Sequence, residues 1–143
     1  ESQNDVFVYT ITDGTQDNTA NITIKVLGAN DNPSAQNDVG VVNEGSTLTV
    51  QNSANANVDG SFDANGEHSG DVIHTTSSSH KDSDLDTNDT LRITQIKKSG
   101  GDNSSVSSGS SYNSSGTSVT GSYGTLTIGA DGSYTYVASS DIS

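Results

Sequence analysis

Residues 119–138 read VTGSYGTLTIGADGSYTYVA, a pattern that indicates the fold class. Apolar and polar residues alternate over 123–128 and again over 133–138, as they do in strands with one buried face. The intervening Ala130-Asp131-Gly132 is typical of a turn. We therefore expect a β-hairpin here. Its inward-facing side chains are expected to be those of Leu126, Ile128, Tyr134 and Tyr136.

Short β-rich runs of the same kind precede this hairpin along the chain. They cover residues 5–12, 19–27, 39–42, 46–51, 71–75 and 90–97. The first two runs flank the turn signal Asp13-Gly14 and are expected to pair as a hairpin. No segment has helical periodicity. Many short strands joined by polar turns favour an all-β fold, an antiparallel β-sandwich.

The chain is expected to divide into three parts: an N-terminal hairpin at 1–28, a linker at 29–38 and a sandwich body at 39–143. The linker holds the only proline, Pro33, among Asn, Asp and Ser, and these residues favour turns. Within the body, polar loops are predicted at 52–70 and 77–89. The Ser/Gly/Asn-rich residues 99–118 are expected to form a mobile loop or an irregular edge.

Composition excludes several classes of function. The net charge is −13, from 18 acidic and 5 basic residues, whereas nucleic-acid binding needs clustered Lys and Arg. No run approaches the ~20 apolar residues of a membrane-spanning helix. No nucleophile elbow or Walker motif is present, and we expect no enzymatic activity. Cysteine is absent, so bound metal is the remaining candidate for stiffening, although the acidic charge can also serve solubility alone.

Four segments together resemble VCBS-type, cadherin-like (bacterial Ig-like) repeats of giant secreted RTX-type adhesins. They are the hairpin at 119–138, DVFVYTITDGTQDNTANITIKVLGANDNP at 5–33, DSDLDTNDTLRITQI at 82–96 and VNEGSTLTV at 42–50. The resemblance implies an Ig-like or cadherin-like sandwich that is secreted, extracellular and associated with the cell surface. The insert at 52–80 and the Ser-rich loop after Ser99 depart from the compact family pattern.

The two hairpins stand in a permuted frame relative to that family. In the family, the YGTLTI hairpin precedes the F-x-Y-T hairpin within one module, whereas here it follows. We expect the body to lack its last strands and a neighbouring copy to supply them, by donor-strand complementation or by continuity in a tandem array. Closure by the chain's own hairpin is a third possibility. The expected function is a structural subunit of an extracellular adhesin or filament, joined head-to-tail.

Two groups of residues are candidate calcium ligands. The run DSDLDTND offers Asp82, Asp84, Asp86 and Asp89, whose alternating carboxylates suit a hard cation with several oxygen ligands. A solvated acidic loop is the alternative. The linker resembles the N-D-N linker of cadherin-type modules. That resemblance implies a second calcium site formed by Asn30, Asp31 and Asn32 with Glu44, and more weakly Asp38, although these residues also favour plain turns.

The alternative function is a carbohydrate-binding adhesion module that contacts surface glycans through 52–80 and 99–118. Aromatic side chains commonly stack on sugars, and these loops offer only Phe62 and Tyr112. His68, His74 and His80 lack a recognised zinc spacing and are expected to be surface residues.

Overall fold

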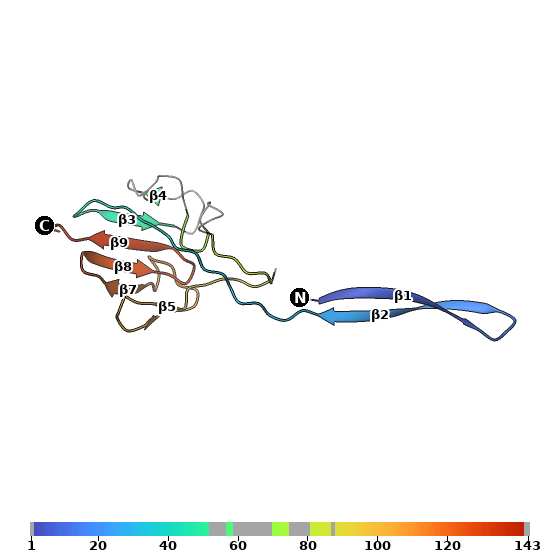
Figure 1. Cartoon of the computed structure of the whole chain (residues 1–143). Coiled ribbons are helices and arrows are strands. Elements are labelled where there is room, and N and C mark those ends of the chain that lie inside the picture. The colour runs from blue at the N-terminus through green and yellow to red at the C-terminus, as the bar shows by residue number, and fades with distance from the viewer. Residues whose placement is uncertain (1, 52–56, 59–69, 75–80, 87, 142–143) are drawn as a thin grey trace. The chain divides into compact units, whose positions relative to one another are not determined.

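The computed structural model describes residues 2–51, 57–58, 70–74, 81–86 and 88–141 (Figure 1). Over these residues the chain is all-β, as predicted, with antiparallel strands and no helix. The strands are β1 (Ser2–Thr12), β2 (Asp17–Leu27), β3 (Thr47–Val50), β4 (Asn57–Val58), β5 (Gln95–Ile96), β6 (Ser104–Ser105), β7 (Thr117–Thr120), β8 (Gly124–Ile128) and β9 (Tyr134–Ala138). The described part of the chain holds no helix of the length and apolarity needed to cross a membrane.

The chain forms two compact units. The first combines Glu1–Asn32 with Asp84–Asp89, and the second combines Pro33–Ser83 with Thr90–Ser143. The acidic loop at 84–89 therefore belongs with the N-terminal hairpin, although it lies far from it in sequence.

The first unit contains the predicted hairpin, in which β1 pairs with β2 along its whole length. The turn is built by Asp13, whose Oδ1 accepts hydrogen bonds from the backbone N–H groups of Thr15 and Gln16 at 2.8 and 2.9 Å. These bonds hold the pKa of Asp13 below its ordinary value, because they stabilise the carboxylate form. Gly14 has a φ of +90°, which a residue with a side chain rarely adopts.

The register of β1 and β2 separates the hairpin into two unlike faces. Phe7 lies opposite Ile22, and successive residues of a strand point to opposite faces. One side carries seven apolar residues, which we call the hairpin apolar face, together with the polar Gln3, Asp5 and Asn18. The apolar residues are Phe7, Tyr9, Ile11, Ala20, Ile22, Ile24 and Val26. The other side is polar apart from Val6, Val8 and Leu27. All of these side chains are exposed.

The second unit is organised around a five-stranded antiparallel sheet with the order β4-β3-β9-β8-β7. Its β8–β9 hairpin matches the prediction, since Leu126 pairs with Tyr136 and Ile128 pairs with Tyr134. A separate two-stranded sheet joins β5 to β6. Several antiparallel sheets of this kind are compatible with a β-sandwich.

One face of the five-stranded sheet carries the core. The buried residues Val106, Ile128 and Ala130 form a cluster, and Val72, Ile93, Ile96 and Tyr134 pack against it. Leu48 and Val50 of β3 are also buried. The core draws on loops and short strands outside the main sheet, which is how a chain with few apolar residues encloses an interior.

The Ser-rich segment differs from the expected mobile loop or irregular edge. It contributes β6 and the buried Val106, and it begins β7. Its Ser110 is also buried: the hydroxyl donates to the Ser107 carbonyl at 2.6 Å and accepts from the Ala130 N–H at 3.0 Å. The buried side chain of Val106 and the hydrogen-bonded hydroxyl of Ser110 together hold this polar segment on the core.

Three predicted strands are wrong in part or in whole. Residues 39–42 form no strand, because Gly40 lies against Leu48 and Tyr134, where an added Cβ would sit 2.9 and 3.2 Å from their side chains. Residues 71–74 form a turn, because the Asp71 carboxylate accepts the N–H groups of Ile73 and His74. Of residues 90–97, only Gln95–Ile96 is a strand. Phe62, His68 and His80 lie outside the described residues.

Candidate functional site

Three of the predicted aspartates come together in the first unit. Ligand atoms of Asp84, Asp86 and Asp89 all lie within 4.8 Å of one another. Oxygens on opposite sides of a calcium ion bound at 2.3–2.6 Å are separated by about 4.6–5.2 Å. The spacing therefore suits a single ion of that size, with further oxygens from backbone or water.

Backbone hydrogen bonds shape this aspartate cluster. Asp84 Oδ1 accepts from the Asp86 N–H at 2.8 Å, and the Asp89 N–H donates to the Asp86 carbonyl at 3.0 Å. Asp86 Oδ2 accepts from the Asp31 N–H at 2.6 Å. The loop is thereby folded so that its carboxylates converge, and it is tied to the segment that follows β2.

The other predicted ligands are distributed between the two units. Asn30, Asp31 and Asn32 belong to the first unit, where the Asn30 side-chain amide donates to the Asp31 carbonyl at 2.9 Å. Asp82 belongs to the second unit, and its Oδ1 accepts from the Gln36 N–H at 2.7 Å. Glu44 also belongs to the second unit.

The donor chemistry of the cluster favours a hard cation. Its ligand atoms are all carboxylate oxygens, whereas zinc sites normally include cysteine sulfur or imidazole nitrogen. Among the histidines, His74 is described, and its Nδ1 lies 3.0 and 3.1 Å from the two carboxylate oxygens of the buried Asp71. That pairing gives His74 a local partner within its own turn.

An apolar groove of about 300 Å³ opens on the second unit. Tyr136 and Ala138 of β9 line it from the sheet. Its other lining residues are Gly40, Val41, Val42, Glu44 and Tyr123. Tyr136 shares the face of the sheet that carries Leu48 and Leu126, its cross-strand partners. The groove therefore continues the core face toward one end of the sheet.

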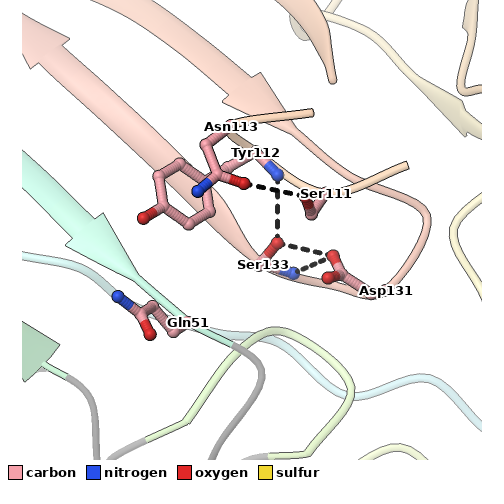
Figure 2. Close-up of a pocket in the computed structure, with 6 residues that line it drawn as sticks. All are labelled: Gln51, Ser111, Tyr112, Asn113, Asp131 and Ser133. Atoms are coloured by element: carbon pink, nitrogen blue, oxygen red, sulfur yellow. Dashed lines mark hydrogen bonds between the residues drawn. The ribbon is translucent and has the colours of Figure 1, made fainter. Parts of the chain in front are cut away.

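A polar hollow of about 260 Å³ lies at the opposite end of the β3–β9 pair (Figure 2). It is lined by Gln51, Ser111, Tyr112, Asn113, Asp131 and Ser133. Gln51 directly follows β3, and Ser133 directly precedes β9. The segment 99–118, predicted as a possible sugar contact, holds Ser111, Tyr112 and Asn113, whereas sequence reasoning missed Gln51, Asp131 and Ser133. The turn signal at Asp131 was visible, but the strand pairing that brings it to Gln51 was not.

Comparison of the chain with protein-family models, with curated proteins and with solved structures gave no match. The likeness to VCBS-type repeats therefore stays a prediction that rests on the four segments quoted above.

Proposed function

We propose that this chain is a structural module of an extracellular adhesin or filament, with an Ig-like or cadherin-like sandwich as its body. Neighbouring copies are joined head-to-tail, and the N-terminal hairpin of one copy packs on the body of the next. The location outside the cell and the module type rest on the sequence resemblance. The proposed contact between copies is inferred from the exposure of the hairpin apolar face.

The exposure of that face is the observation that carries the proposal. Its six large side chains are between 46% and 61% exposed. Taking about half of the 150–250 Å² of an aromatic side chain, and somewhat less for aliphatic ones, the face presents on the order of 500 Å². A standard interface takes about 800 Å² from each partner, so this face supplies most of an apolar interface core.

A two-stranded hairpin needs such a partner. An isolated pair of strands is marginally stable in water, and its outer edges offer unpaired N–H and C=O groups to other chains. Packing the apolar face against another sheet would bury the exposed side chains and complete a two-layer arrangement.

The body of another copy provides a matching surface. The apolar groove continues the core face of the five-stranded sheet, and Val41 and Tyr123 in its lining are exposed. A hairpin laid over this end of the sheet would extend the second layer that covers the core. Packing of the hairpin on its own body is the competing arrangement, and the experiment below separates the two.

In this proposal, calcium binds beside the segment that follows β2. The aspartate cluster is bonded to Asp31, four residues beyond the end of β2. A calcium ion held by Asp84, Asp86 and Asp89 would offset two of the three negative charges of these crowded carboxylates and stiffen the segment that leaves the hairpin. Ligands added from a neighbouring module would stiffen the joint further.

Sedimentation velocity over a range of protein concentrations tests the joint. The wild-type chain is expected to form oligomers that grow with concentration. Phe7→Asp places a charge on the apolar face and should leave monomers. Val8→Asp, which places the same charge on the opposite face, should assemble as the wild type does. Monomeric wild-type protein at every concentration would overturn the joining of separate copies, and protection of hairpin amides in that monomer would indicate closure on the chain's own body.

A further inference from the structure

We propose that the polar hollow binds a single neutral sugar residue. The hollow lies wholly within the second unit, at the opposite end of the β3–β9 pair from the apolar groove. The inference therefore stands on observations separate from those that carry the joint between copies.

Close backbone packing holds the walls of the hollow in place. Ser111 and Ser114 exchange backbone hydrogen bonds at 3.0 and 3.1 Å, which closes a tight turn. This turn lies directly on Gly129, where an added Cβ would collide with the Ser111 backbone. Since any side chain at 129 would separate the two turns, the glycine keeps Tyr112 and Asn113 close to the Asp131 turn.

Buried Ser133 orients the carboxylate of Asp131. The Ser133 side chain and backbone both donate to Asp131 Oδ1, at 2.5 and 3.0 Å, and the Ser133 hydroxyl accepts from the Tyr112 N–H at 3.1 Å. Ser133 is 2% exposed. Its hydrogen-bonding capacity is used in fixing the site, and Figure 2 shows it between Tyr112 and Asp131.

The remaining polar groups of the hollow can bind sugar hydroxyls, because a hydroxyl can both donate and accept a hydrogen bond. No donor within the described residues is assigned to Asp131 Oδ2, so this oxygen can accept. Asn113 Oδ1 accepts from the Ser111 hydroxyl at 2.9 Å, which leaves its amide nitrogen as a donor. Gln51 adds a further amide at the rim. The lining of the hollow therefore offers both an acceptor and a donor to the hydroxyls of a sugar.

The half-buried ring of Tyr112 supplies the apolar part of the site. An aromatic ring with a polar tip can cover the C–H face of a sugar while its hydroxyl stays wet. The volume of about 260 Å³ lies just below the roughly 300–1,000 Å³ of drug-sized pockets, which fits one ring.

The charge of the chain and the number of carboxylates in the hollow indicate which class of molecule can bind there. Asp131 and the net charge of −13 disfavour acidic sugars, phosphates and other anions. A calcium ion takes six to eight oxygen ligands and favours several carboxylates, whereas Asp131 is the only carboxylate among the described residues that line the hollow. A neutral sugar satisfies both constraints.

Amide NMR titration of the full chain tests this site. The probes are D-glucose, D-galactose, D-mannose and N-acetyl-D-glucosamine, with D-glucuronate as the charged comparison, each up to about 10 mM. At least one neutral sugar is expected to give saturable shifts at residues 111–113 and 131–133, with a Kd on the order of 1 mM.

Substitutions test whether the sugar binds in the polar hollow and not elsewhere on the chain. Asn113→Ala alters an exposed side chain and should weaken binding at least about tenfold, and Tyr112→Ala should do the same where the spectrum confirms the fold. Asn103→Ala, which lies outside the hollow, should bind as the wild type does. Absence of saturable shifts with every neutral sugar, stronger binding of D-glucuronate, or unchanged binding by Asn113→Ala would each overturn the proposal. None of these outcomes bears on assembly through the hairpin.

Discussion

Phe7 of β1 lies directly opposite Ile22 of β2, and both side chains are about half exposed, at 55% and 48%. In the second unit, the cross-strand neighbours Ile128 and Tyr134 are instead packed in the core. The two hairpins share the same alternation of apolar and polar residues. They differ in that the second has loops and short strands over its apolar face, and this contrast underlies the proposed joint between copies.

Salt is expected to strengthen the association of copies. Each copy carries a net charge of −13, so copies repel one another while their apolar faces attract. Raising NaCl from about 10 mM to about 150 mM shortens the Debye length from about 30 to about 8 Å. The apparent Kd from sedimentation should fall severalfold. A Kd that rises with salt would mean that ion pairs drive the contact.

Calcium is expected to raise the melting temperature through the aspartate cluster. Wild-type protein should melt several degrees higher in millimolar CaCl₂ than in EDTA, because the ion binds the folded arrangement of Asp84, Asp86 and Asp89. Asp86→Asn should lose most of this difference. Asp102→Asn removes the same charge from an exposed position outside the cluster and should keep this difference. Equal melting of the wild type in CaCl₂ and EDTA would remove calcium from the proposed function.

The Ser-rich segment is expected to contribute to stability through one residue. Val106 is 7% exposed and Val137 is 51% exposed, so the same substitution can be made at a buried and an exposed site. Val106→Ala should lower the free energy of unfolding by about 2 kcal/mol, since it removes two buried methyl groups and leaves a cavity. Val137→Ala should change it by less than about 0.5 kcal/mol. Urea unfolding measures both, and equal effects would contradict the buried position of Val106.

Local sequence patterns predicted the elements that are determined by residues close together in the sequence. Both hairpins combine alternating residues with a turn signal, and both are present. The strand predicted at 39–42 failed because Gly40 packs across Leu48, a contact that no local pattern reveals. The buried role of 99–118 was missed because a single Val106 among serines and glycines produces no periodicity.

The candidate sites were predictable to different degrees. Asp84, Asp86 and Asp89 are neighbours in sequence, so their convergence needed only a loop. Asp82 bonds to Gln36, which lies 46 residues away, and nothing in the acidic run distinguished it from the other three. The polar hollow joins residues 51, 111–113, 131 and 133 through the pairing of β3 with β9 and the packing of the Ser111 turn on Gly129, so its assembly could not be predicted without the fold.

Alkaline pH is expected to destabilise the second unit through Tyr134. Burial, reinforced by the charges of Asp38 and Asp71, raises the pKa of this phenol from 10.0 to about 12. The folded state therefore favours the neutral phenol. The resulting stability is fully present below pH 10 and is lost as the pH rises from 10 through 12, by up to about 3 kcal/mol. Tyr134→Phe cannot ionise, so its urea midpoint should fall less over this range than that of the wild type. Tyr123→Phe, at an exposed tyrosine, should retain the wild-type decline, and identical pH dependence in all three proteins would contradict the buried environment of Tyr134.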